Sequence, residues 1–422
     1  MPRCIQMRRR IESYLRQMQT IRFLLLITCI SLTLSVIWIQ LVDSQKTIFV
    51  NESLIHEVIK NVARDYRYAE VYRRTDKLPS NVKHILLWTE YDFAPFYYFG
   101  KGQKAFIDKN CSVINCYVTT DRDYFNGDVS KFDYIFFNGR NINPLTKADL
   151  PQNRSSRQKY IYFNMESAEN IPVCSAMYDD FFNATATYRL DSDIPIPYIQ
   201  IKDIYGEVIG PRAEMDWIEG GAVVDENLAL RLRNKTKAVA WFVSNCKSRN
   251  NRQEYVKKLQ QALVRYNLNV DIYGKCGPLT CPRKQKNCST ILDKDYFFYL
   301  SFENSFSDDY VTEKLITALQ HDVVPIVFGG ADYSRFLPPG SYLNARDTTP
   351  TELAATIAHL MNSYTKYSRF FGWKQYYSFR DPSNNDNVCS VCKALNEESM
   401  EKPKYYKQFR SWWLPNFGER CR

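Results

Sequence analysis

The chain has 422 residues, 15% of them aromatic, and carries a formal net charge of +10. This length suffices for two domains with well-filled cores, and the low numbers of glycine and proline, 15 and 18, exclude a largely disordered chain. Half of the net charge lies in the first 22 residues, and the remainder contains no Lys/Arg block. A nucleic-acid partner is therefore not indicated, and an anionic small ligand explains the charge as well.

An apolar run without charge, Phe23 to Val42, is long enough to span a bilayer. Six arginines and one glutamate precede the run, and Asp43 follows it. We take residues 23–42 as the membrane span. The positive-inside rule then places residues 1–22 in the cytoplasm and the chain after residue 42 on the other side of the membrane, as in a single-pass type II protein. A cleaved signal sequence is the alternative, but signal-peptide cores are shorter and no small-residue cleavage site follows the run.

Cysteines and glycosylation sequons agree with this topology. Ten of the twelve cysteines follow the span, an even number that suits a disulfide-bonded lumenal domain. The N-x-S/T sequons all lie on the proposed lumenal side, which favours exposure to the secretory pathway. The candidate glycosylation sites are Asn51, Asn110, Asn153, Asn183, Asn234 and Asn287.

Residues 43–78 are charged, with helical patches and no strand run, and we interpret them as a stem. Three aromatic-rich runs typical of buried strands follow, at His84–Thr89, Phe132–Asn138 and Lys159–Asn164. The segments between these strands have room for crossover helices. Residues 79–211 are therefore predicted to form a first α/β domain.

A second alternation of strands and helices indicates another α/β domain, at residues 212–375, before a C-terminal segment at residues 376–422. Its first elements and its last helix are predicted at Ala238–Ser244 (strand), Asn251–Tyr266 (amphipathic helix), Val270–Tyr273 (strand) and Thr351–Met361 (helix).

The middle of this second domain reads as a strand–helix–strand unit. A strand at Tyr296–Phe302, a polar turn at Asn304–Asp309, a helix at Tyr310–Gln320 and a strand at Val323–Phe328 follow one another. In such units ligands bind at the carboxyl ends of the strands, beside a helix N-terminus. The partial positive charge of the helix N-terminus and the full charge of Lys314 suit a diphosphate.

The same unit carries three motifs. Residues 299–305 read YLSFENS, residues 309–314 read DYVTEK and residues 324–329 read VPIVFG. They resemble the signature of the α1,3/α1,4-fucosyltransferases of glycosyltransferase family 10, which is roughly F-x-L-x-F-E-N-S, D-Y-x-T-E-K and V-P-x-V-x-G. The resemblance implies a GT-B fold, in which two Rossmann-like domains face a cleft. It also implies a GDP-fucose site that includes Glu303, Asn304, Tyr310, Glu313 and Lys314, with Glu313 on the ribose.

A carboxylate follows the third predicted strand, in the stretch NMESAEN at residues 164–170. From the residues alone, a Glu166 at a helix N-terminus is the simpler interpretation, although a carboxylate at the edge of a cleft also suits a general base. The stretch resembles the family's E-S-P-x-H/N motif, with Ala168 in place of Pro, and this resemblance implies that Glu166 is the catalytic base. Glu169 is the competing carboxylate.

Two further stretches resemble the family. Residues 240–245 read AWFVSN and residues 252–255 read RQEY, which is similar to V-A-W-x-V-S-N and A-R-x-x-Y. Arg252 can offer a bidentate fork to phosphate, although a solvated helix residue is the plain alternative. The resemblance adds four residues to the expected donor site: Tyr198, Ser244, Asn245 and Arg252.

The stretch Asp191-Ser192-Asp193 is a D-x-D pattern, with which many other glycosyltransferases hold Mn²⁺ on a diphosphate. The pattern is poorly specific and occurs at two other places in the chain. We favour the interpretation that the two carboxylates cap local backbone, because Lys314 and Arg252 already supply positive charge. We therefore expect no metal site and no required cofactor, with Mn²⁺ at most stimulating the reaction.

The resemblance also implies disulfides, because the family tends to clip an early cysteine pair to a late one. We expect Cys111 and Cys116 to be bonded to Cys389 and Cys392. A zinc half-site at the late pair is disfavoured, since no second ligand pair of suitable spacing exists. Cysteines expected to serve a local insert are Cys276, Cys281 and Cys288, with Cys246 or Cys174 as partners.

The resulting hypothesis is a Golgi membrane enzyme that transfers L-fucose from GDP-β-L-fucose to a GlcNAc hydroxyl, usually O3, with inversion. Glu166 would take the acceptor proton, while Arg252, Lys314 and the amides before Tyr310 would stabilise the departing GDP. The alternatives are a metal-dependent glycosyltransferase of another donor specificity and an inactive lumenal glycan-binding homologue. The sequence leaves open the oligomeric state and whether the acceptor is an N-glycan core, an antenna or a glycolipid.

Overall fold

The computed structural model describes residues 16, 18–22, 26–36, 81–89, 92, 94–218, 224–280, 289–402 and 404–421, without the side chains of residues 383–386 and 401. The chain divides into two units, Met1–Arg74 and Thr75–Arg422. In the first unit, the helix Met18–Val36 is long and apolar enough to cross a membrane, by length and composition alone, and a signal sequence meets the same criterion. The expected stem, Asn51 and Asn287 lie outside the described residues.

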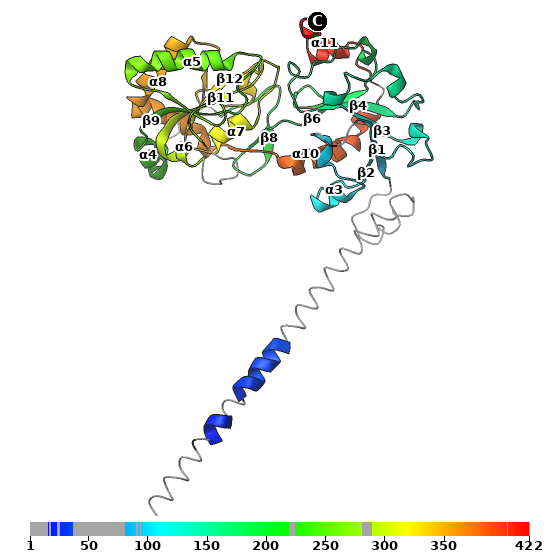
Figure 1. Cartoon of the computed structure of the whole chain (residues 1–422), viewed down its shortest axis with the longest axis horizontal. Coiled ribbons are helices and arrows are strands. Elements are labelled where there is room, and N and C mark those ends of the chain that lie inside the picture. The colour runs from blue at the N-terminus through cyan, green and yellow to red at the C-terminus, as the bar shows by residue number, and fades with distance from the viewer. Residues whose placement is uncertain are drawn as a thin grey trace, which may run out of the picture. The chain divides into compact units, whose positions relative to one another are not determined.

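The second unit begins with a parallel sheet of six strands in the order β2-β1-β3-β4-β5-β6 (Figure 1). The residues of β2 to β5 are all buried, as expected for a parallel sheet that is covered on both faces. The strands are β1 (Lys83–Leu87), β2 (Cys116–Thr119), β3 (Tyr134–Asn138), β4 (Lys159–Asn164), β5 (Ala184–Thr187) and β6 (Ile194–Pro195).

The connections within this sheet differ from the expected crossover helices. The described connections contain one short α-helix, α3 (Lys104–Asp108), and otherwise three-residue 3₁₀ turns. Side chains that begin such turns, Asp128, Asn138 and Ser175, each accept a hydrogen bond from the backbone N–H two residues later. These local bonds compete with helix continuation, so the chain turns early. The turns are η1 (Phe96–Tyr98), η2 (Val129–Lys131), η3 (Gly139–Asn141), η4 (Lys147–Asp149) and η5 (Ala176–Tyr178).

A second parallel sheet has five strands in the order β10-β9-β11-β12-β13. Its strands are β9 (Lys237–Phe242), β10 (Val270–Tyr273), β11 (Tyr296–Phe302), β12 (Val324–Phe328) and β13 (Leu343–Asn344). Its helices are α4 (Glu226–Arg233), α5 (Arg252–Leu263), α6 (Ile291–Asp295), α7 (Glu313–Leu319), α8 (Pro350–Met361) and α9 (Tyr364–Ser368).

Helices cover both faces of this second sheet. On one face, Leu259 of α5 and Ile357 of α8 share a core with Phe298 of β11. On the other face, Ala318 of α7 packs with Tyr299 of the same strand. The second unit thus contains two parallel sheets, of which the second alternates strand and helix, and this confirms the predicted α/β architecture with two Rossmann-like halves, the GT-B arrangement.

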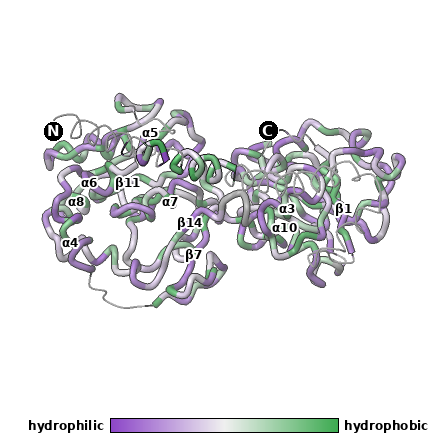
Figure 2. Tube along the Cα trace, turned by 90° about the horizontal axis from the view of Figure 1, so that it is seen from below, coloured by the Kyte–Doolittle hydropathy of each residue, from purple (hydrophilic) through white to green (hydrophobic). Residues whose placement is uncertain are grey.

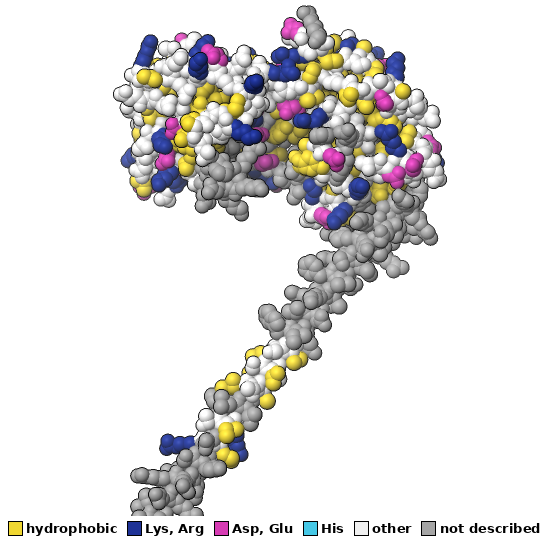
Figure 3. All heavy atoms as spheres, in the orientation of Figure 1, with side chains coloured by type: hydrophobic (Ala, Val, Ile, Leu, Met, Phe, Trp, Pro, Cys, Tyr) yellow, Lys and Arg dark blue, Asp and Glu magenta, His cyan; other side chains and the backbone are white. Residues whose placement is uncertain are grey.

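Hydrophobic and charged residues separate as this architecture requires. In Figure 2, hydrophilic residues are frequent along the outer turns of the tube, and hydrophobic ones are frequent along the strands. On the face drawn in Figure 3, Lys and Arg side chains are interspersed with Asp and Glu over the second unit. The excess positive charge is therefore distributed on this face and does not form one block.

A small third sheet connects the two halves. It consists of β7 (Gln200–Lys202), β8 (Val208–Gly210) and β14 (Ser378–Arg380) in the order β14-β7-β8. Ile199 and Ile201 share a core with Leu315 of α7, so this segment packs with the second half. The chain therefore begins to pack with the second half before residue 211, the residue at which the sequence analysis ends the first domain.

The chain returns to the first half after residue 380. Val391 and Leu395 of α10 (Ser383–Leu395) pack against Ile85 and Phe136 of the first sheet. Farther on, α11 (Phe409–Trp413) and α12 (Phe417–Arg420) follow, and Phe409 and Trp413 enter a core on the opposite face, with Tyr162 and Phe182. The C-terminal segment thus supplies helices that the connections of the first sheet lack.

Four disulfides fix these arrangements. The predicted clip is confirmed, with Cys111 bonded to Cys389 and Cys116 bonded to Cys392. Of the alternative partners for the local insert, Cys246 is the one bonded to Cys276. Cys174 is bonded to Cys421, a pair that the sequence does not predict. Cys281 and Cys288 lie outside the described residues.

We predict that the two bridges of the clip are redundant. Each closes a loop of nearly the same length, with sequence separations of 278 and 276. On the chain-entropy model, either bridge alone retains most of the constraint on the unfolded chain, whereas loss of both releases roughly 5–6 kcal/mol. The test measures the free energy of unfolding by denaturant for three variants: Cys111→Ser/Cys389→Ser, Cys116→Ser/Cys392→Ser and the fourfold variant. The fourfold variant should lose much more of this free energy than the two double variants lose together. Additive losses would contradict this account.

Candidate active site

The candidate site lies where β4 and β11 end. Glu166 follows β4 by two residues, and Glu303 follows β11 directly. Both strands are internal to parallel sheets, so their carboxyl ends open on the edge where ligands bind in α/β folds. The turn after each strand contacts the turn after the other, which brings the two motifs of the sequence together.

The carboxylate of Glu166 is held at one oxygen. Its Oε1 accepts hydrogen bonds from the hydroxyl of Tyr310 at 2.9 Å, from Nδ2 of Asn170 at 3.0 Å and from the backbone N–H of Ser167 at 3.0 Å. With Oε1 occupied, Oε2 is the oxygen available to a reacting hydroxyl.

Ala168, which stands where the family motif has proline, makes a specific contact. Its backbone N–H donates to the hydroxyl of Tyr188 at 3.0 Å, and the ring of Tyr188 meets that of Tyr310 edge to face at 4.9 Å. Proline lacks this N–H and would lose the bond. The departure from the motif is therefore matched by a tyrosine that supports the same turn.

Small polar side chains join the turn at residues 304–309 to the turn at residues 166–170. The hydroxyl of Ser305 donates to that of Ser167 at 2.7 Å, and Nδ2 of Asn170 donates to Oδ1 of Asn304 at 3.1 Å. Both serines are fully buried. These residues lie inside the motifs that the sequence singles out, but only the tertiary structure shows that they contact each other.

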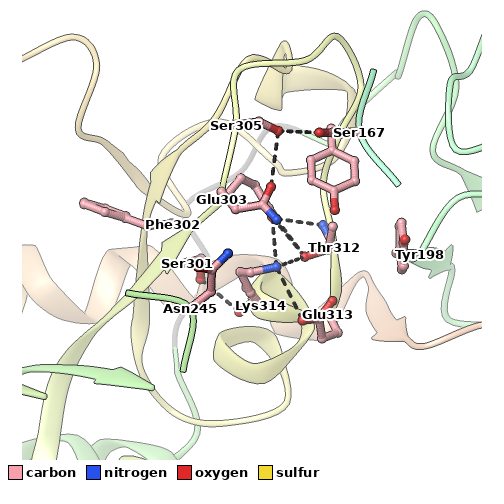
Figure 4. A network of polar contacts seen from close by, with 12 residues as sticks. Ser167, Tyr198, Asn245, Ser301, Phe302, Glu303, Ser305, Thr312, Glu313 and Lys314 are labelled. Carbon is pink, nitrogen blue, oxygen red and sulfur yellow. Dashed lines mark hydrogen bonds and ion pairs between the residues drawn. The ribbon is translucent and has the colours of Figure 1, made fainter. Parts of the chain in front are cut away.

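Lys314 lies between two carboxylates (Figure 4). Its Nζ is 3.0 Å from Oε2 of Glu303 and 3.4 Å from Oε1 of Glu313, and it also donates to the hydroxyl of Thr312 at 2.6 Å. Burial by itself lowers the pKa of Lys314, but the two carboxylates outweigh burial and the net pKa is raised. The ammonium therefore stays charged throughout the physiological range.

Glu303 differs in role from the expected donor ligand. It is 1% exposed, and burial raises its pKa while Lys314 opposes the rise. Its Oε1 accepts the backbone N–H of Thr312 at 2.8 Å as well as the hydroxyl of that residue. Glu303 is thus an internal counter-ion that positions Lys314, whereas the side chain of Glu313 is 63% exposed and free to face a ligand.

The helix after this turn begins later than predicted. Helix α7 starts at Glu313, whereas the sequence placed its start at Tyr310. The N–H groups of Tyr310 and Val311 donate to the backbone carbonyls of Ser307 and Asp309, and that of Thr312 donates to Glu303. Local acceptors therefore occupy the N–H groups of Tyr310, Val311 and Thr312, and the expected role of the amides before Tyr310 stays a prediction.

Arg252 also lies differently from expectation. It is 3% exposed, and its two terminal nitrogens donate to the backbone carbonyls of Phe302 and Asn245. Burial lowers its pKa, and Glu303 opposes this shift. Arg252 therefore ties the ends of β9 and β11 together, and its fork is not presented to solvent in this structure.

The remaining expected donor residues surround this centre. Ser244 and Asn245 are exposed just after β9, and Asn304 is half-buried. The hydroxyl of Tyr198 donates to the backbone carbonyl of Met165, and its ring meets that of Tyr310 at 6.2 Å. A cavity of about 210 Å³ opens beside Met165, Tyr198 and Glu313.

The D-x-D carboxylates are occupied by protein donors. Asp191 is paired with Arg189 at 2.8 Å and accepts the indole N–H of Trp412 at 3.0 Å. Asp193 accepts the backbone N–H of Thr185 at 2.9 Å, together with bonds from Lys404 and Tyr406. Within the described residues, no group of three or more His, Cys, Asp or Glu is placed to hold a metal ion. The interpretation that these carboxylates cap local backbone holds for the bond of Asp193 with Thr185, whereas Asp191 binds the side chains of Arg189 and Trp412.

The sequons differ in accessibility. Asn110, Asn153 and Asn234 are exposed. Asn183 is 4% exposed, its Nδ2 donates to the backbone carbonyl of Lys404, and its Oδ1 accepts the N–H of Tyr160. A glycan on Asn183 is incompatible with this packing, so Asn183 is removed from the set of proposed glycosylation sites.

Comparison with known protein families shows which family the chain belongs to. Residues 80–199 match the fucosyltransferase N-terminal family, and residues 232–412 match the C-terminal region of glycosyltransferase family 10, the fucosyltransferases. The chain belongs to glycosyltransferase family 10. As a fucosyltransferase, it is an enzyme.

Named relatives agree with this membership. Alpha-(1,3)-fucosyltransferase C of Drosophila melanogaster is 35% identical over 79% of this chain and 78% of its own length. Glycoprotein 3-alpha-L-fucosyltransferase A of the same species is 36% identical over 74% of this chain and 57% of its length. The human 4-galactosyl-N-acetylglucosaminide 3-alpha-L-fucosyltransferase FUT6 is 33% identical over 75% and 79%. A crystal structure of an alpha1,3-fucosyltransferase with GDP-fucose aligns with 77% of this chain and 93% of that one, at 16% identity and a TM-score of 0.46.

The occupied D-x-D carboxylates generate a prediction for this fucosyltransferase. In Asp193→Asn, the pair with Lys404 is lost, so the melting temperature should fall, while the KM for the sugar donor should remain within about twofold of wild type because no metal bridge is removed. Lys404→Gln is the matched control and should lower the melting temperature similarly. A selective rise in donor KM in Asp193→Asn, absent in Lys404→Gln, would favour a metal role.

Proposed function

We propose that this fucosyltransferase transfers L-fucose from GDP-β-L-fucose to a GlcNAc hydroxyl of a glycoprotein or glycolipid glycan, forming an α1,3 linkage with inversion at the anomeric carbon. The observation that carries the proposal is the contact between Glu166, with one free carboxylate oxygen, and the turn that leads to Lys314. The names of the relatives, which are 3-α-fucosyltransferases, support the linkage and the acceptor class.

The charges of Glu166 and Lys314, one beside each of the two turns, suit the following reaction. The acceptor oxygen attacks the anomeric carbon of fucose as its proton moves to Oε2 of Glu166, and the bond from that carbon to the GDP oxygen breaks. Negative charge then grows on the diphosphate, where the ammonium of Lys314 opposes it. Tyr310 and Asn170 keep Oε1 of Glu166 fixed, so the base does not need to reorient during the step.

The exposed residues of the donor half bind the nucleotide in this proposal. Glu313 is accessible and holds the ribose hydroxyls. Asn304, Tyr310 and Tyr198 line the donor site, and Ser244 and Asn245 face it from the end of β9. Arg252 contributes positive charge from beneath the strand ends. Glu303 acts through Lys314.

We also propose a Golgi location. The apolar helix Met18–Val36 anchors the chain as a type II protein with the second unit in the lumen. The four disulfides of the described residues suit an oxidising compartment. The exposed Asn110, Asn153 and Asn234 are the proposed glycosylation sites among the described residues.

Glu166→Gln tests the base. Glutamine keeps the size of the side chain but cannot accept the acceptor proton, so kcat should fall on the order of 100- to 10,000-fold while GDP-fucose binding changes little. The measurement is GDP release by the purified lumenal part, with donor affinity from calorimetry. Glu169→Gln, which removes the competing carboxylate, should cause a much smaller loss. A fully active Glu166→Gln enzyme would remove Glu166 from the mechanism.

Lys314→Ala tests the charge at the leaving group. Turnover should fall on the order of 100-fold or more, because the developing diphosphate charge loses its closest cation. The melting temperature should also fall, because Glu303 remains buried without its counter-ion. The control is Glu303→Gln/Lys314→Ala, which should recover melting temperature but not turnover. Lys314→Arg should restore activity only in part, since a planar fork is not a point charge.

The same GDP-release assay tests the alternative that a metal is required. We expect substantial activity in EDTA, with at most a mild stimulation by Mn²⁺, because protein cations already face the leaving group. Loss of activity in EDTA that Mn²⁺ restores, in an enzyme whose Glu166→Gln variant remains active, would favour the metal-dependent alternative.

A further inference from the structure

The loop that carries Glu166 has little support of its own. Residues 165–175 follow β4 and form neither helix nor strand. Ala168 in the middle of this loop is 2% exposed, so something covers it. Ala168 belongs to a core that also includes Phe409, Trp413 and Leu414 of the distant segment at residues 404–421.

The segment 404–421 contacts successive points of the loop. The indole N–H of Trp413 donates to the backbone carbonyl of Ile171 at 2.8 Å. The guanidinium of Arg420 forms an ion pair with Oε2 of Glu169. The disulfide between Cys421 and Cys174 closes the far end.

A chain of rings also leads from the segment to the base. Trp413 packs on Tyr188 at 5.7 Å, and Tyr188 packs on Tyr310 at 4.9 Å. Tyr188 accepts the N–H of Ala168, and Tyr310 donates to Glu166. The segment thus contacts the catalytic loop both along its backbone and through the residues that hold its carboxylate.

We propose that the segment 404–421 is a brace for the catalytic loop and that Arg420 is a positioning residue for the transfer reaction. Arg420 neutralises Glu169, which lies three residues after Glu166 on the same turn, and holds the turn whose next residue, Asn170, donates to Glu166. The inference rests on the proposed role of Glu166 as base. It assigns a function to Glu169 that is structural and electrostatic and does not involve proton transfer.

The charge of Glu169 matters because the surroundings of Glu166 are otherwise neutral or balanced. Tyr188, Tyr198 and Tyr310 face Glu166, and burial raises the pKa of each, so all three remain uncharged. Beyond them, the ammonium of Lys314 is paired with Glu303 and Glu313. An unpaired Glu169 would add a negative charge near the base, disfavour the ionised form of Glu166 and move the loss of activity to higher pH.

The test uses Arg420→Gln in the full lumenal part, with kcat/KM measured against pH. The acidic limb of the profile of kcat/KM against pH should move to higher pH by roughly half a pH unit. The kcat at neutral pH should fall about 10-fold, while the KM for the donor changes little. In Arg420→Gln/Glu169→Gln, which removes both charges, the acidic limb should return to the wild-type position. Lys404→Gln removes an ion pair of the same segment with Asp193, away from the loop, and should leave the limb in place.

The outcomes separate this proposal from the proposed function. If Glu166→Gln is inactive but Arg420→Gln has the wild-type profile and kcat, the brace is rejected while the base stands. If Arg420→Gln merely melts at lower temperature, with no shift that the double variant reverses, Arg420 is a stability residue and the proposal is again overturned. If Glu166→Gln is active, the base itself is rejected, and with it the positioning role.

Discussion

The buried pair of Lys314 and Glu303 is the interaction on which the site depends. Glu303 directly follows β11, Lys314 is the second residue of α7, and the pair fixes the turn between them with the help of Thr312. Removing one member of such a buried pair typically costs about 3–5 kcal/mol, because the other charge stays buried and unpaired. The pair therefore constrains where the ammonium lies before any donor arrives, so little reorganisation is needed when charge develops on the diphosphate.

The turn fixed by this pair is also the turn that contacts the base. Ser305 reaches Ser167, Asn304 reaches Asn170 and Tyr310 reaches Glu166. Gly330 makes this approach possible, because a Cβ there would meet the backbone of Phe306 and Ser307 at 2.6–2.8 Å. The position of the proposed proton acceptor in one half of the molecule thus depends on a charge pair in the other half, and donor and acceptor chemistry share one support.

Sequence reasoning succeeded where the signal is local. Strands β4, β10 and β11 have the predicted bounds, since each is a short run rich in apolar and aromatic residues. It missed β5 (Ala184–Thr187), because short alanines and threonines carry no strong strand pattern, although the strand is fully buried. It also placed Arg252 toward a ligand, whereas packing turns the guanidinium toward two backbone carbonyls. The Cys174–Cys421 bridge joins residues 247 apart and has no local signature. These misses are all set by tertiary contacts, which no window of the sequence contains.

Charge balance at the site limits how the donor can bind. Lys314 is compensated by Glu303 and Glu313 in this structure, so an arriving diphosphate meets no uncompensated cation at that position. Glu303 cannot leave, since it is 1% exposed and bonded to Thr312. Glu313 can move away from Lys314, since its side chain is 63% exposed and it lies farther from the ammonium than Glu303 does. Under the proposed function, ribose hydroxyls would attract Glu313 away from Lys314, and the released charge would then act on the diphosphate. Nucleotide recognition and leaving-group stabilisation would in that case be coupled through one exposed carboxylate, which explains why two adjacent residues at the start of α7 carry opposite charges.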